Sequence, residues 1–204
     1  MLHKLARFRQ RIRNAFEEVR VAVLYARGGV TSRLPTPKER ELLLTVSDLI
    51  DAGYRVPFDG SCEAWIARTA ADGAISVKYS YEANEAPPGY LRLILITRIE
   101  RERSSQEAAA VFQEGIDSYA TGATQVGARF VFKGNLQKWC DNAYYAFTLA
   151  EPNETVVGCV LSFQKGRMVY SVILRGVILE SEQDMEQLVY PFLERGLRWC
   201  AEGA

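Results

Sequence analysis

The sequence predicts an α+β protein in which an antiparallel β-sheet is flanked by helices and preceded by an amphipathic helical arm. Two observations predict this class. From Tyr54 onward, long stretches place apolar side chains at every second position, as half-buried strands do. Helix-capping residues stand before, within and after these stretches. The chain has 204 residues, of which 48% are hydrophobic and 25% charged, and this is enough to bury one full core.

Residues 1–30 form the predicted basic arm. Apolar side chains at helical spacing make one stripe, and arginines and a lysine flank it on both sides. Such a helix packs on its own domain, associates with another copy, binds a partner, or lies at a membrane surface with its cationic heads in water. The sequence leaves these alternatives open. The expected contact residues are Lys4, Arg7, Phe8, Arg9, Arg11, Ile12 and Arg13.

The net charge of zero conceals an asymmetry between the arm and the rest of the chain. Residues 1–40 hold 10 Lys or Arg and 3 Glu, so the remaining residues are acidic overall. An acidic body repels phosphates, and we therefore expect a protein partner, or a second copy, and not a nucleic acid. The composition fits a cytoplasmic protein. An arginine-rich amphipathic start is also typical of a mitochondrial or organellar targeting segment.

The sheet domain is expected over residues 36–204. Two prolines and two threonines over 31–37 indicate a linker to the arm. Thr36, Pro37 and Glu39 then form the start of a helix with a capping box, which we expect to continue to about Asp51.

Three strands are predicted next. Alternation over 62–68 and 75–82 indicates a hairpin that turns at Asp72-Gly73. Residues 90–102 form a longer strand whose middle is apolar on both faces, as in a central strand. Its charged end, with Arg98 and Glu100 on one face, predicts ion pairs where the strand leaves the core for solvent.

A second capping box at Ser104–Glu107 predicts a helix that reaches Tyr119. Four more strands follow, and short turns join the last three into an antiparallel meander. Ser181 caps a closing helix that runs to Cys200, and Pro191 is expected to bend or split it. The four strands are predicted over 128–133, 143–151, 155–164 and 167–179.

The residues that carry most enzyme chemistry are scarce. The single histidine, His3, stands at the start of the chain, and the four cysteines show no metal-binding or redox spacing. Phosphate-binding glycine loops and nucleophile-elbow motifs are absent from the sequence. We therefore predict a protein with no catalytic residues, no metal and no cofactor.

A carrier of small apolar or lipid ligands is the alternative function. Trp139 and Tyr144 follow an irregular stretch and are candidates to line a ligand cleft. Alternation places Tyr145 and Phe147 toward the core, which leaves Tyr144 as the exposed aromatic residue.

Residues Phe163 to Val172, with the sequence FQKGRMVYSV, followed by the helix over 186–193, resemble the end of the PsbP-like fold. That family includes the photosystem subunit PsbP, a Ran-binding release factor and bacterial DcrB-type proteins. The resemblance covers about residues 54–200 and implies an α/β/α sandwich that serves as a non-catalytic binding module. It therefore favours a protein-interaction or chaperone-like adaptor. Residues 1–53 depart from the family pattern.

Overall fold

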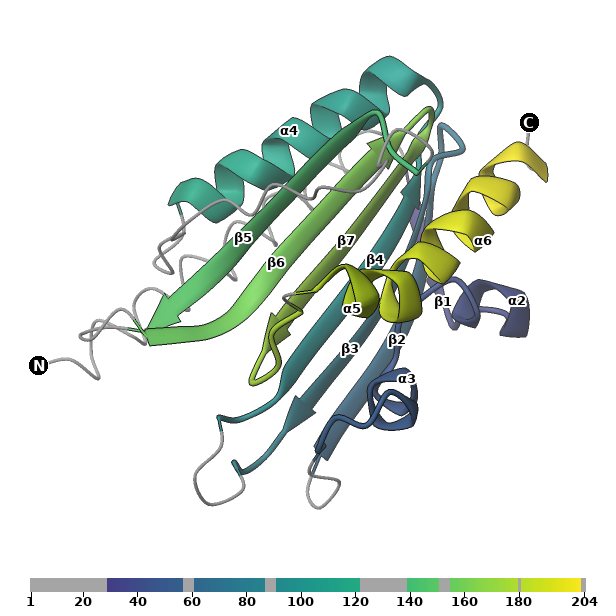
Figure 1. The fold of residues 1–204 in the computed structure, drawn as a ribbon. Helices are drawn as coiled ribbons and strands as arrows, with labels where there is room; N and C mark the ends of the chain where they lie inside the picture. The colour runs from purple at the N-terminus through teal and green to yellow at the C-terminus, as the bar shows by residue number, and fades with distance from the viewer. Residues whose placement is uncertain are drawn as a thin grey trace, which may run out of the picture.

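A computed structural model of the chain describes residues 29–56, 61–86, 91–121, 139–150, 155–179 and 181–202. Within these ranges, seven antiparallel strands form one sheet in the order β1-β2-β3-β4-β7-β6-β5 (Figure 1). The predicted coarse class, α+β with an antiparallel sheet, is confirmed. The strands are β1 (Val30–Arg33), β2 (Ser61–Ala70), β3 (Ile75–Ala83), β4 (Ile94–Arg101), β5 (Asn142–Ala150), β6 (Thr155–Lys165) and β7 (Met168–Arg175).

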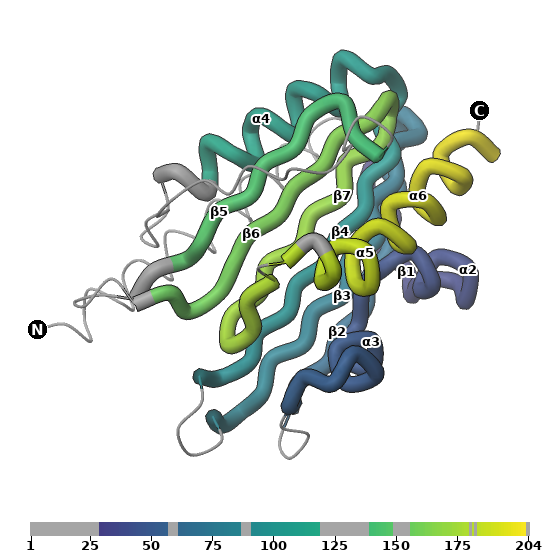
Figure 2. Tube along the Cα trace, viewed as in Figure 1, coloured from purple at the N-terminus to yellow at the C-terminus, as the bar shows by residue number. Residues whose placement is uncertain are grey.

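Helices lie on both faces of the sheet. The larger core joins one face to α3, α5 and α6, while α4 packs on β5, β6 and β7 from the other side. Figures 1 and 2 show α4 running along this part of the sheet, apart from the other helices. The described helices are α2 (Pro37–Arg40), α3 (Val46–Asp51), α4 (Ser105–Thr121), α5 (Glu182–Leu188) and α6 (Tyr190–Glu202).

The predicted order of strands is largely confirmed. The hairpin β2-β3 turns at Gly73, whose φ of 89° is one that glycine adopts at little cost. Strand β4 is central, as its apolar middle predicted, and β5, β6 and β7 form the predicted meander. The strand predicted over 128–133 lies outside the described residues.

The linker predicted over 31–37 is wrong in its first part, because Val30–Arg33 form strand β1. These four residues pair with Ala67–Ala70 at the edge of the sheet. The strand is short and mostly exposed, so its residues lack the apolar alternation by which buried strands are recognised.

The single helix predicted from Pro37 to Asp51 is also wrong, because the chain leaves the helical path between α2 and α3. Thr45 and Asp48 start α3 with a capping box of their own. Three sheet side chains bind the intervening backbone. The Leu44 amide donates to Tyr170 Oη at 3.1 Å, the Val46 amide donates to Tyr79 Oη at 3.3 Å, and Thr97 Oγ1 donates to the Leu44 carbonyl at 2.9 Å.

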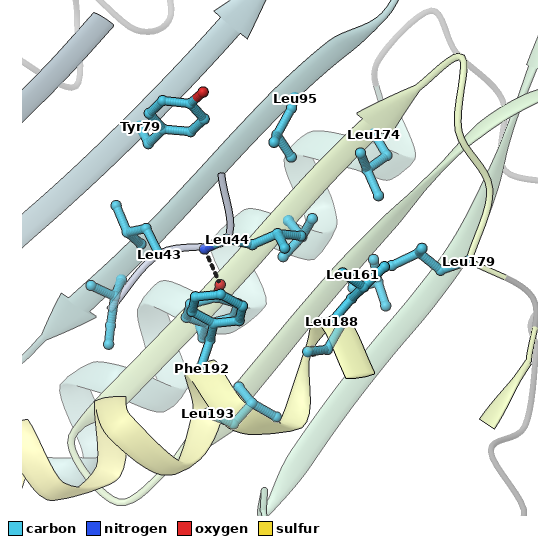
Figure 3. Close-up of a cluster of buried hydrophobic side chains, with 14 of the residues drawn as sticks. Leu43, Leu44, Tyr79, Leu95, Leu161, Leu174, Leu179, Leu188, Phe192 and Leu193 are labelled. Atoms are coloured by element: carbon cyan, nitrogen blue, oxygen red, sulfur yellow. Dashed lines mark hydrogen bonds between the residues drawn. The ribbon is translucent and has the colours of Figure 1, made fainter. Parts of the chain in front are cut away.

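This linking segment is part of the core. Leu42, Leu43 and Leu44 are all buried, with Leu44 0% exposed. Figure 3 shows Leu43 and Leu44 among leucines of the sheet and of α5 and α6, with a dashed line for the hydrogen bond of the Leu44 amide. Backbone that lacks helical hydrogen bonds is therefore buried only because sheet hydroxyls supply its partners.

The closing helix is divided into α5 and α6, as the position of Pro191 led us to predict. Ser181 caps α5 with Asp184 as its partner, Val189 separates the two helices, and Pro191 falls in the first turn of α6. Proline is tolerated there because the first amide groups of a helix have no partner within the helix.

An ion pair joins β1 to α2. Arg33 Nη1 donates to Glu39 Oε2 at 2.6 Å, and the Thr36 amide donates to the same oxygen at 2.8 Å. The hydrogen bond from Arg33 is the main reason that the pKa of Glu39 is held below its usual value.

A pH-dependent contribution to stability is expected from Glu39. A carboxyl group whose pKa is lowered by folding stabilises the protein above its unfolded value of about 4.3, and this contribution is lost as the pH falls through the folded pKa. Urea unfolding from pH 7 down to pH 3 measures it. The Glu39→Gln variant is expected to be less stable than the parent at pH 7, and the difference is expected to shrink toward pH 3. Glu41→Gln, at an exposed position next to the same helix, is the matched control. A difference that stays constant with pH would contradict the assignment.

Candidate interaction surface

The two residues of the predicted ligand cleft lie in different layers of the molecule. Trp139 packs against the larger core, where its ring stacks on Tyr190 with 5.6 Å between centroids. Tyr144 belongs to the cluster under α4 on the opposite face of the sheet. Its predicted exposure is wrong, because α4 covers this part of β5 and leaves the side chain 8% exposed. The structure therefore does not bring these two residues into one cleft. Tyr145 and Phe147 are in contact on the core face, as alternation predicted.

The predicted contact residues of the arm lie outside the described part of the chain. They are Lys4, Arg7, Phe8, Arg9, Arg11, Ile12 and Arg13.

Among the described residues, helix covers the α4 side of the sheet over only part of its width. Buried Val77, Tyr79 and Tyr81 point to the larger core, so the residues between them point to the α4 side. Of the described helices, α4 is the one packed on this side, and its cluster comprises residues of β5, β6 and β7. Most side chains of β2, β3 and β4 on this side are only partly buried, whereas Glu100 is buried. We call this surface the open face and define it as Ile66, Lys78, Ser80, Ile94, Ile96 and Arg98.

The register fixes how the open face is arranged. Ile66 pairs with Lys78, and Lys78 pairs with Arg98 on the next strand. The neighbouring row brings Ser80 beside Ile96. The side chains of directly opposite residues on antiparallel strands lie about 5 Å apart at Cβ, so Lys78 lies between Ile66 and Arg98 in one row, with Ser80 and Ile96 in the next.

The charges at the centre of the open face are unusual for a sheet. Like charges on directly opposite residues destabilise a strand pair, and Lys78 and Arg98 are such a pair. Arg98 Nη2 lies 2.9 Å from Glu100 Oε2, and their side chains are 23% and 8% exposed. The three groups together carry one net positive charge.

The ion pair between Arg98 and Glu100 was predicted, but its predicted place in solvent is wrong. Glu100 is 6% exposed, and both residues belong to the central strand β4. Alternation shows which side chains share a face of a strand, but it does not show how far the neighbouring strands and helices cover that face.

Apolar side chains on the open face connect it to the α4 cluster. Ile96 pairs with Ile173 on β7, and Ile173 packs against the cluster under α4. Apolar side chains that are partly exposed next to polar and charged ones are a common feature of protein-binding surfaces.

The described cysteines do not form an obvious reactive site. Burial raises the pKa of the Cys140 thiol and raises that of Cys200 to about 11, so both thiols are protonated near neutral pH. Cys62 is exposed on β2. Among the described residues, no group of three or more His, Cys, Asp or Glu side chains is placed to hold a metal ion. No described helix is long and apolar enough to cross a membrane.

Comparison of the chain with protein-family models, with curated proteins and with solved structures finds no match. The relation to the PsbP-like family therefore stays a prediction.

Proposed function

We propose that this protein is a non-catalytic adaptor that binds another protein through the open face, with the basic arm as a second contact. The observation that carries the proposal is the row of Ile66, Lys78 and Arg98 beside partly buried isoleucines on the α4 side of the sheet. A partner can bury the apolar side chains of such a surface, while complementary charges select which partner binds.

The opposite face of the sheet is buried, which supports binding of a partner at the open face. There the side chains of β3, β4, β6 and β7 are almost all buried beneath α3, α5, α6 and the leucines that precede α3. That face is occupied by the chain's own core, which leaves the α4 side as the sheet surface for a partner.

The layered arrangement agrees with what the PsbP-like resemblance implies. Helices on both faces of the antiparallel sheet support the α/β/α sandwich that the resemblance implies, and the resemblance also implies binding modules on that scaffold. The carrier alternative depended on Trp139 and Tyr144 lining one cleft, and their separation leaves the adaptor as the better-supported function.

Substitution of Ile66 by glutamate tests the proposal. The side chain is only partly buried and belongs to neither core cluster, so the variant is expected to fold. Affinity purification from cells that express the protein, quantified by mass spectrometry, is expected to show partners that the parent binds and Ile66→Glu loses. Thermal unfolding establishes that both variants are folded.

Ile75→Glu is the matched control for this experiment. Ile75 is also half-exposed but belongs to the opposite face of the sheet, where it packs against the larger core. Partners retained by Ile75→Glu and lost by Ile66→Glu support the open face. Equal retention by both variants would count against it.

A further inference from the structure

Strand β1 covers only part of the outer edge of β2. Its four residues pair with residues 67–70, whereas β2 begins at Ser61. The chain cannot continue as a strand along β2, because Arg33 is held by Glu39 at 2.6 Å and Pro35, which follows, has no amide hydrogen. Among the described residues, no strand pairs with residues 61–65 on this side. We call this stretch of β2 the uncovered edge.

The backbone of the uncovered edge directs hydrogen-bonding groups outward at every second residue. The Ala70 amide donates to the Ala74 carbonyl oxygen at 2.9 Å, so Ala70 bonds toward β3. Alternate residues of an antiparallel strand bond to opposite neighbours, and positions 62 and 64 therefore also bond toward β3. The amides and carbonyls that face away from β3 are those of Ser61, Glu63 and Trp65.

The uncovered edge is exposed and regular. Its residues up to Ala64 are exposed, and its register with β3 runs without a shift. Natural edge strands are commonly protected by lysine, proline or a β-bulge, and this stretch has none of them. Strand β5, at the other edge of the described sheet, differs because Tyr144, Tyr145 and Ala146 are buried.

An extended segment is the partner that such a backbone fits. Its own amides and carbonyls can pair with those that β2 directs outward, as in the addition of a strand to a sheet edge. Ala64 shares the α4 side with the larger Ile66, so a bulky apolar side chain of the added strand can lie over the small Ala64.

The charge of Glu63 selects a further residue of the segment. Glu63 is exposed and forms no ion pair with a described residue, and its side chain interacts with the Tyr79 hydroxyl, which does not neutralise the carboxylate. A basic side chain opposite Glu63 is therefore favoured. Arg40 lies 5.3 Å from the ring of Trp65, so a second basic residue is disfavoured at that row.

We infer that the uncovered edge binds an extended segment of a partner protein, which adds an antiparallel strand to β2 and places an apolar residue at Ala64 and a basic residue at Glu63. This edge is a second binding surface, separate from the open face.

Amide hydrogen exchange of the full chain, followed by NMR, first tests whether the edge is open. The amides of Glu63 and Trp65 are expected to exchange quickly, and those of Ala64 and Ile66 slowly, because β3 binds them. Slow exchange of the Glu63 and Trp65 amides at every protein concentration would show that the chain covers its own edge. Exchange that slows with protein concentration would assign the edge to a second copy. Either result overturns the inference.

The probe for binding is a short synthetic peptide that alternates valine with threonine and carries one lysine in place of the central threonine. The valines match Ala64, and the lysine matches Glu63. At saturation, the peptide is expected to slow exchange of the Glu63 and Trp65 amides at least about tenfold. No binding overturns the inference. A peptide with glutamate in place of lysine that binds equally well overturns the preference for a basic residue.

Two N-methylated peptides form the matched pair that tests backbone pairing. In the paired strand, the lysine and threonine amides face β2, whereas the valine amides face away. Methylation of the lysine and threonine amides is expected to weaken binding about tenfold or more, and methylation of the valine amides is expected to change it little. Equal effects of the two modifications overturn the inference.

The Glu63→Pro variant removes an outward amide from the protein itself. It is expected to bind the probe about fivefold or more weakly than Glu63→Gln, which keeps the amide and also lacks the charge. Slow exchange at Ala64 establishes that β2 remains paired with β3. If Glu63→Pro does not fold, the N-methylated pair decides the question alone. The open face is tested independently by Ile66→Glu, so either binding surface can fail without the other.

Discussion

Replacing Gly158 with alanine is expected to lower the free energy of unfolding by about 3 kcal/mol or more. A Cβ atom at this position would lie 2.0 Å from the Leu174 carbonyl oxygen and 2.8 Å from Arg175 Cα, both in the backbone of β7. Strand β7 is paired with β4 on its other side, so its backbone has little freedom to move away from β6. Strand β6 bends near its start in Figure 1. Gly158 pairs with Thr148 on β5, and the register between the two strands shifts directly after Thr148.

Guanidinium chloride unfolding of the Gly158→Ala variant measures this loss. Gly115→Ala is the matched control, because the added Cβ in the middle of α4 meets no described atom within 4 Å apart from its own helix backbone. Alanine stabilises a helix interior by about 0.5–1 kcal/mol relative to glycine, so the control is expected to gain stability. A Gly158→Ala variant as stable as the parent would show that the close approach of β6 to β7 is not required.

The double variant Tyr79→Phe with Tyr170→Phe is expected to lose about 2–5 kcal/mol of unfolding free energy. Each change removes the hydroxyl that accepts a buried amide, of Val46 and of Leu44 respectively. An amide left unpaired in a buried site costs about 1–3 kcal/mol. Both tyrosines are 0% exposed, so water does not replace the lost hydroxyl at the protein surface.

Tyr54→Phe provides the comparison for the tyrosine variants. Its hydroxyl donates to Asp184 Oδ1 at 2.8 Å, but the pair is only partly buried. Water can hydrate that carboxylate after the change, and the expected loss is below about 1 kcal/mol. Losses of equal size for Tyr54→Phe, Tyr79→Phe and Tyr170→Phe would contradict the importance of the segment between α2 and α3.

Thr97→Val tests whether the same segment acts as a unit. Thr97 binds the carbonyl of Leu44, whose amide binds Tyr170. Because both side chains bind Leu44, Thr97→Val and Tyr170→Phe are expected to show a coupling energy in a double-variant cycle. The second substitution should lower the free energy of unfolding by less once the first has displaced the segment.

Capping residues, proline and alternation in the sequence correctly predicted several helix starts and strands. The capping boxes at Thr36 and Ser181 mark the starts of α2 and α5, and Pro191 marks the boundary near α6. Alternation located β2, β3 and β6. These signals succeed because capping and alternation involve residues only a few positions apart.

The wrong predictions concern features that distant residues decide. The leucines after α2 continue a helical pattern, but α2 ends at Arg40, and Tyr170, which is 126 positions from Leu44, accepts the Leu44 amide in place of a helical carbonyl. The Thr45–Asp48 capping box was the local signal that could have located the second start. The open face was missed for a related reason, since the identity of Lys78 does not show that a strand with Arg98 lies beside it.

The strand order has a consequence for how the chain folds. Strands β2, β3 and β4 form one set of sequential hairpins, β5, β6 and β7 form another, and the sheet is continuous between them only through the pairing of β4 with β7. Hairpins close within microseconds because their ends are near in sequence, whereas pairing of remote strands must first overcome the entropy of a long loop. Two separate nuclei are therefore expected to form early, and their union at β4 and β7 sets the rate. The pairing of β4 with β7 also completes the sheet next to the open face, because it places Arg98 opposite Ser171.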